Sequence, residues 1–224
     1  MDPILFIVFL PLLAAIIGGL GNRMLGNTAV KVLTTGALFI AAALSWPIFF
    51  SYLTGSAEPH VVPVLRWVQS GSLSFDWALK VDTLTAVMLV VVTTVSAVVH
   101  LYSWGYMDED PDQPRFFAYL SLFTFAMLML VTADNLVQLF FGWEGVGLAS
   151  YLLIGFWFKK PSASAAAIIG GLGNRLLGNT VVKALTTGAL FIAAGLSWPI
   201  FFSYLTGSAQ PHVVPVLQDR KSVV

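Results

Sequence analysis

The chain has no cysteine and only three histidines among its 224 residues. Without cysteine it can form no disulfide, no thiolate zinc site, no iron–sulfur ligation and no cysteine nucleophile, and the scattered histidines lack metal-ligand spacing. We therefore expect no cofactor and no metal in this chain. Charged residues are also scarce, at 10% against about 25% in a soluble domain. Eleven basic residues balance eleven acidic ones, so the net charge does not suggest nucleic acid as a partner.

Hydrophobic residues, by contrast, make up 58% of the chain, and its mean hydropathy is +0.85. A helix needs about 20 apolar residues to cross the hydrocarbon core of a bilayer. Five runs come close to this length, at 4–20, 28–53, 84–104, 116–131 and 136–158, and a sixth lies at 181–205. We predict an all-α polytopic membrane protein of five to six transmembrane helices that is embedded in the lipid bilayer. Asp82 and Asp134 stand where the N-caps of the third and fifth helices are expected.

The segment between the second and third runs has the pattern of β-structure. Apolar and polar residues alternate over 73–81, and 62–68 can form the opposing arm across a turn at 69–72. We predict a β-hairpin whose apolar face packs on the helix ends or on a neighbouring subunit. Basic residues fall mostly in alternate loops, so the positive-inside rule places the N-terminus and the hairpin outside and the basic loops at 22–30, 105–115 and 159–162 inside.

An internal repeat occupies the last part of the sequence. Residues 14–65 recur at 166–217 with five differences over 52 positions. The symmetry of transporter folds is usually detectable only as weak similarity between halves, so a copy this close favours a recent recombination. The copy also begins inside the first apolar run, which leaves only 163–172 ahead of Asn174 and Arg175. Ten residues are too few to cross a bilayer.

Glu144 is the residue that most clearly suggests a function. It lies near the middle of the fifth apolar run, in Gly142-Trp143-Glu144-Gly145-Val146-Gly147. An acid at that depth costs roughly 2.5 to 3.5 kcal/mol on insertion scales, and such residues often mark proton relays. We expect Glu144 to face the helix bundle and to take up and release protons; the alternative is a hydrogen-bonded clamp between helices.

The runs HLYSWGYMDEDPDQPRFFAYLSLF, from His100, and LVTADNLVQLFFGWEGVGLASYLLIGFWFKKPSASAAA, from Leu130, closely resemble the antiporter-like chain 5, or subunit L, of respiratory complex I. The resemblance extends from the N-terminus to about Ala167. It implies a fragment of the proton-translocating membrane-arm subunit of NADH:quinone oxidoreductase, with no redox centre of its own: flavin, iron–sulfur centres, NADH and quinone belong to other subunits. It also implies that Glu144 belongs to the proton channel and pairs with a lysine on a later helix. In this sequence the repeat stands where the later helices of the family begin.

Further expectations follow from this resemblance. The domains are 1–60, the first two helices; 61–115, the chain 5 N-terminal region; 116–165, the start of the antiporter-like domain; 166–217, the repeat; and 218–224, a tail. The partners are other membrane-arm subunits, and the location is the bacterial cell membrane or, alternatively, the mitochondrial inner membrane. His100 is a possible supporting residue for proton access, or else an interfacial cap. The rival functions are a multi-subunit cation/proton antiporter subunit and a recombination product without activity.

Overall fold

The computed structural model describes residues 2–70 and 73–168. Its elements are, in order, α1 (Pro3–Leu20), α2 (Asn22–Leu53), β1 (His60–Ser70), β2 (Leu73–Val81), α3 (Thr83–Tyr106), α4 (Gln113–Val131), α5 (Leu136–Ile154) and α6 (Pro161–Ala167). A second unit, Gly173–Val224, lies outside the described residues. It contains most of the repeat and the sixth predicted span, which therefore remain predictions from sequence.

All five predicted spans within the described part of the chain are confirmed. The helices α1, α2, α3, α4 and α5 are each long and apolar enough to cross a membrane. The predicted bounds hold to within a few residues except in two places. α2 begins at Asn22, but Gly26 at φ +73° separates its first turn from the main span. α5 ends at Ile154 with Gly155 as its C-cap, whereas we expected the helix to continue to Phe158.

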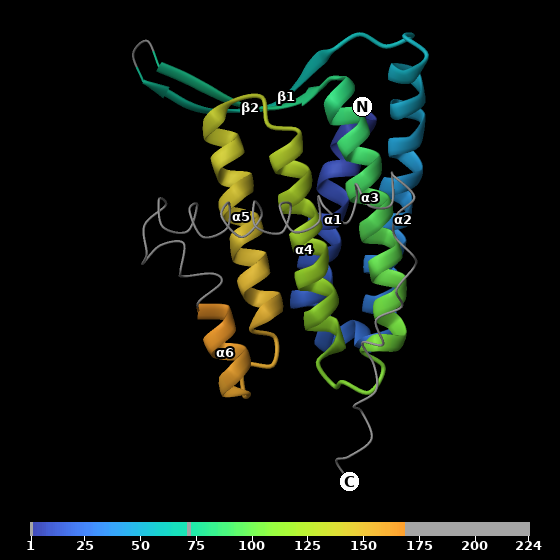
Figure 1. Ribbon diagram of the computed structural model, residues 1–224, viewed down its shortest axis with the longest axis vertical. Helices are drawn as coiled ribbons and strands as arrows, with labels where there is room; N and C mark the ends of the chain where they lie inside the picture. Colours follow the sequence, from blue (N-terminus) through green and yellow to red (C-terminus); the bar gives the residue numbers. More distant parts are fainter. Residues whose placement is uncertain (1, 71–72, 169–224) are drawn as a thin grey trace, which may run out of the picture. The chain divides into compact units, whose positions relative to one another are not determined.

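α4 lies at the centre of the bundle and α5 lies at its edge. α4 packs against α1, α2, α3 and α5, whereas the main neighbours of α5 are α4 and the short α6 (Figure 1). Only 17% of the span-length window of α5 is buried, against 39–44% for the other four spans. One broad side of α5 is therefore left uncovered by the described residues, and Glu144 belongs to this helix.

The predicted hairpin is confirmed, and it lies across the end of the bundle where α4 leads into α5 (Figure 1). β1 and β2 pair antiparallel from His60 opposite Val81 to Ser70 opposite Leu73. Leu79 and Val81 on β2 belong to the same buried cluster as Ile4, Leu89 and Leu128 of the helices. The apolar face of the hairpin thus packs on the helix ends, the first of the two alternatives that we expected.

Two backbone contacts extend this attachment to the α4–α5 connection. The Lys80 N–H donates to the Thr132 carbonyl at 2.9 Å, and Leu79 forms an isolated antiparallel bridge with Ala133. Because a two-stranded hairpin is marginally stable alone, these contacts explain how it holds its place. They also fix the N-terminal end of the helix that carries Glu144, which we call its outer end after the topology predicted from the sequence.

Candidate functional site

Glu144 is placed one residue from the midpoint of α5, whose 19 residues run from Leu136 to Ile154. At about 1.5 Å rise per residue, a helix of this length nearly matches the roughly 30 Å hydrocarbon core. Glu144 therefore lies near mid-depth if α5 spans the bilayer, as we expected. It is the only acidic residue within the five described spans.

The expectation that Glu144 faces the bundle is wrong for the described residues. The Glu144 side chain is exposed, among apolar neighbours that are exposed as well, namely Phe140, Phe141, Trp143 and Leu148. The buried residues of α5 are Gln138, Gly142 and Ala149. With about 100° of rotation per residue, Glu144 lies about 200° around the helix from Gly142, almost opposite the face that contacts α4.

The outer end of α5 is held by two amide side chains. Asn135 is the N-cap: its Oδ1 accepts from the Gln138 N–H at 2.9 Å, and its Nδ2 donates to the Asp76 carbonyl at 2.9 Å. The prediction that Asp134 caps this helix is therefore wrong by one residue, whereas Asp82 does cap α3 by accepting from the Thr85 N–H at 2.8 Å. The fully buried Gln138 accepts from the Ala78 N–H of β2 at 3.2 Å, so hairpin and helix are tied together.

The inner end of α5 is held by Arg115 of α4. Its Nη2 donates to the Phe156 carbonyl at 3.2 Å and pairs with Asp112 at 3.0 Å, while the guanidinium lies 4.6 Å from the centre of the Phe156 ring. These contacts fix the chain just beyond the C-terminus of α5. With the outer anchors, they hold both ends of the helix in place.

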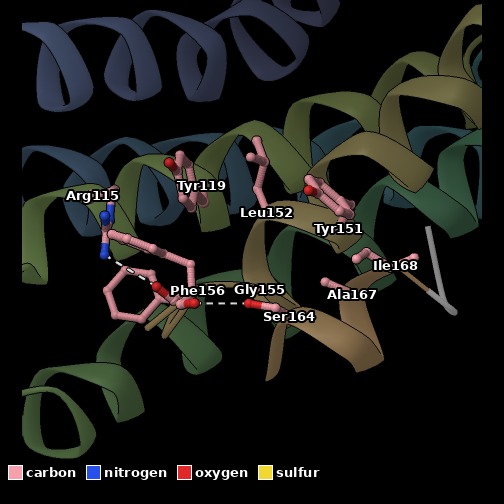
Figure 2. A pocket seen from close by; sticks show the side chains of 10 residues that line it. Arg115, Tyr119, Tyr151, Leu152, Gly155, Phe156, Ser164, Ala167 and Ile168 are labelled. Atoms are coloured by element: carbon pink, nitrogen blue, oxygen red, sulfur yellow. Dashed lines mark hydrogen bonds between the residues drawn. The ribbon is translucent and has the colours of Figure 1, made fainter. Parts of the chain in front are cut away.

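A small cavity of about 220 Å³ lies beside this inner anchor, between α4, α5 and α6 (Figure 2). Its walls include Arg115, Tyr119, Tyr151 and Ser164, but the Ser164 hydroxyl donates to the Phe158 carbonyl at 2.8 Å. The volume is below the roughly 300–1,000 Å³ of typical ligand pockets. Among residues 2–70 and 73–168 there is also no group of three or more His, Asp or Glu side chains that could hold a metal ion.

His100 is placed inside the bundle, not at its surface. Its side chain is fully buried six residues before the end of α3, so the interfacial-cap interpretation is wrong. Nδ1 lies 2.8 Å from the Ser96 carbonyl, and Nε2 lies 3.0 Å from the Ser121 hydroxyl of α4. Since a carbonyl only accepts, Nδ1 carries the proton, and in the neutral ring Nε2 accepts from Ser121. His100 thus joins α3 to α4.

Hydroxyl pairs continue this polar line along α3. Thr93 meets Ser45 of α2 at 2.9 Å, and Ser96 hydrogen-bonds to Thr124 of α4. Sequence reasoning missed these residues, although Thr93, Ser96, His100 and Ser103 are spaced three or four apart and therefore share one helix face. The structure does not bring His100 and Glu144 together: His100 packs on α4, and Glu144 points away from it.

Comparisons with known proteins agree with this arrangement. Residues 67–117 match the family described as NADH-ubiquinone oxidoreductase (complex I), chain 5 N-terminus, and residues 133–196 match the family described as NADH:quinone oxidoreductase/Mrp antiporter, TM. The second match continues beyond Ala167, where we expected the resemblance to end. Together with the five span-length helices, these matches define a multi-pass membrane protein of the antiporter-like class.

The relatives narrow this class to one family. The chain is 52% identical over 204 residues to NADH-quinone oxidoreductase subunit L of Rhodobacter capsulatus, an alignment that covers 88% of this chain and 28% of the relative. It is 49% identical over 172 residues to NADH-ubiquinone oxidoreductase chain 5 of Triticum aestivum, with 77% and 26% covered. It is also 42% identical over 208 residues to chain 5 of Marchantia polymorpha, with 93% and 31% covered. The chain belongs to the subunit L and chain 5 family, and it spans between a quarter and a third of the length of these relatives.

Proposed function

We propose that the chain is part of a proton-translocating membrane-arm subunit of NADH:quinone oxidoreductase, and that Glu144 is a residue that takes up and releases protons. The observation that carries this proposal is the position of Glu144. It is the only acidic residue within the five described spans, and it lies next to the midpoint of one of them. A carboxylate at that depth is costly, and such residues mark functional sites, proton relays among them.

The exposed side of α5 supports this role. A proton carrier needs a neighbour that stabilises its charged form in one state and withdraws in another. The α4 side of α5 is filled by close backbone packing around Gly142 and leaves no room for such a neighbour. Glu144 points to the opposite side of α5, which residues 2–70 and 73–168 leave largely uncovered. The family resemblance implies that a lysine from a later helix takes this place in longer relatives.

The redox chemistry of the whole complex is assigned to other subunits. NADH oxidation and quinone reduction require flavin and iron–sulfur centres, and the cysteine ligands of such clusters are lacking in this chain. The proposed function of this chain within the complex is therefore to move protons in the membrane and to contact other membrane-arm subunits. Electron transfer and proton movement are then separable by mutation.

The test uses complex I of Rhodobacter capsulatus, mutated in subunit L at the position that aligns with Glu144. We expect Glu144→Gln to lower the number of protons moved per electron while electron transfer from NADH to quinone continues in part. The control is Glu58→Gln, which lies in the loop after α2 and matches Gln210 at the same place in the repeat of this chain. Undiminished proton movement in Glu144→Gln would contradict the role of Glu144.

A second candidate function is a cation/proton antiporter subunit, because the family that matches residues 133–196 includes Mrp antiporters. The same complex distinguishes the two functions. If proton movement requires sodium and is accompanied by sodium in the opposite direction, the antiporter function is favoured. Proton movement that depends on NADH oxidation and ignores sodium favours complex I.

A further inference from the structure

Among the glycines of α5, Gly142 makes the tightest contact with α4. A β-carbon added at Gly142 would lie 2.7 Å from both the Cα and the backbone nitrogen of Leu130, and 3.0 Å from its Cβ. Carbon atoms in favourable contact are separated by roughly 3.5–4.0 Å. The two atoms at 2.7 Å belong to the backbone of α4, so no change of rotamer at Leu130 can relieve the overlap. Only glycine fits this position.

The two other glycines of the motif are less constrained. At Gly145 an added β-carbon would meet the side-chain Cβ of Ala126 at 3.2 Å, which is tight but involves no backbone atom of α4. At Gly147 it would meet no atom of residues 2–70 and 73–168 within 4 Å. The three glycines of the Glu144 motif therefore differ in what they do. Gly142 sets how closely and at which rotation α5 lies against α4, and Gly147 does not.

We infer that Gly142 is a positioning residue for Glu144: its backbone contact with Leu130 fixes the rotation of α5 and so directs the Glu144 carboxylate to the side of the helix opposite α4. The inference rests on the proposed function of Glu144. A methyl group at Gly142 must move the helices apart, or rotate α5, by about 1 Å at the contact. The Glu144 side chain extends farther from the helix axis than the Cα radius of about 2.3 Å. A rotation that moves the backbone by about 1 Å at the contact therefore moves the Glu144 carboxylate by a larger distance.

Because α5 is anchored at both ends, a rotation forced at Gly142 must be taken up within the helix. Gln138 and Asn135 hold the outer end through β2, and Arg115 holds the inner end through the Phe156 carbonyl. The helix therefore cannot turn freely as a rigid rod. A local displacement at Gly142 is passed along the backbone to Glu144, two residues further on.

The experiment observes the Glu144 carboxylate directly. The chain contains only three glutamates, so Glu58→Gln and Glu109→Gln leave Glu144 alone. The full chain is made by cell-free synthesis with carboxyl-¹³C glutamate and reconstituted in lipid bilayers, and the single ¹³C signal is recorded by solid-state NMR. We expect the signal to shift in Gly142→Ala and to stay in its parental position in Gly147→Ala. An unshifted signal in a folded Gly142→Ala chain would overturn the inference.

A second pair of variants covers the case in which Gly142→Ala does not fold. Gly145→Ala makes the milder contact with Ala126, and Ala126→Gly removes the atom that it meets. We expect Gly145→Ala to shift the Glu144 signal and the double variant to restore it. Because Gly145 adjoins Glu144 in sequence, the restoration is the informative result, and a shift that persists in the double variant would contradict positioning through α4.

Proton movement in complex I of Rhodobacter capsulatus separates this inference from the proposed function. If the proposed function holds, both Glu144→Gln and Gly142→Ala at the aligned positions lower the proton yield. If Glu144→Gln has no effect, the proposed function fails, while the NMR shift still decides the positioning. If Glu144→Gln lowers the yield but Gly142→Ala changes neither yield nor signal, the positioning inference alone fails.

Discussion

The hydrogen bond between His100 and Ser121 should couple α3 to α4 measurably. Both side chains are fully buried, and Nε2 and the hydroxyl oxygen are 3.0 Å apart. Interhelical hydrogen bonds in membranes contribute about 0.6 kcal/mol on average and up to about 1.7 kcal/mol. We expect a value of about 1 kcal/mol, because neither group has access to water as a substitute. It stays below the maximum because, once His100 is gone, the Ser121 hydroxyl can turn to a carbonyl of its own helix.

A double-mutant cycle with His100→Phe and Ser121→Ala measures this coupling. Phenylalanine keeps an aromatic ring at position 100 and removes both nitrogens, and the cycle subtracts the packing cost that each single variant carries alone. The free energy of unfolding is measured for the full chain by steric trapping in bicelles. The control cycle pairs Ser121→Ala with Ser103→Ala, whose hydroxyl donates to Val99 of its own helix at 2.7 Å. A coupling below about 0.3 kcal/mol, the usual additivity error for independent sites, would refute the reasoning.

Three further predictions concern the ends of the helices. The N–H of Thr85, with Lys80 nearby, holds the pKa of Asp82 below its ordinary value. The ionised Asp82 carboxylate therefore stabilises the fold fully above the unfolded pKa of about 3.9, and this stabilisation is lost as pH falls through the lower folded pKa. Asp82→Asn should make the free energy of unfolding less dependent on pH in this acid range, and an unchanged dependence would contradict the prediction. Gln138→Leu should leave the Ala78 N–H without an acceptor, cost about 1–3 kcal/mol and speed hydrogen exchange at that amide; unchanged protection would show that another group accepts. A cytoplasm-active reporter inserted after Asp110 should be active, and the same reporter in the loop after α2 inactive; the reverse pattern would invert the predicted topology.

The spans could be predicted because each depends on its own composition. Five apolar runs of crossing length, and a period of two at 73–81, need no tertiary information. The end of α5 was misplaced because Phe156, Trp157 and Phe158 are apolar, although the helix stops at Gly155 and Phe156 packs against Arg115. Asp134 and Asn135 are both good caps, and composition alone does not choose between them.

The direction of Glu144 could not be predicted for a different reason. α5 is apolar around most of its circumference, so its sequence does not show which side meets another helix. That choice is made by the Gly142 contact with the Leu130 backbone, which exists only once α4 is in place. His100 was likewise misjudged, because its depth in the bundle depends on Ser121 of another helix.

The attachment of the hairpin also constrains the order in which the chain can be assembled during synthesis. β1 and β2 are complete once residue 81 has been made, but the groups that hold them, at Thr132, Ala133 and Gln138, are synthesised about fifty residues later. At roughly 5–20 residues per second, the paired strands wait several seconds for these contacts. During this interval the apolar residues of β2 can pack on segments already made, such as Ile4 of α1, but not on Leu128 of α4. Delivery of the fifth helix is thus the event that completes the attachment of the hairpin.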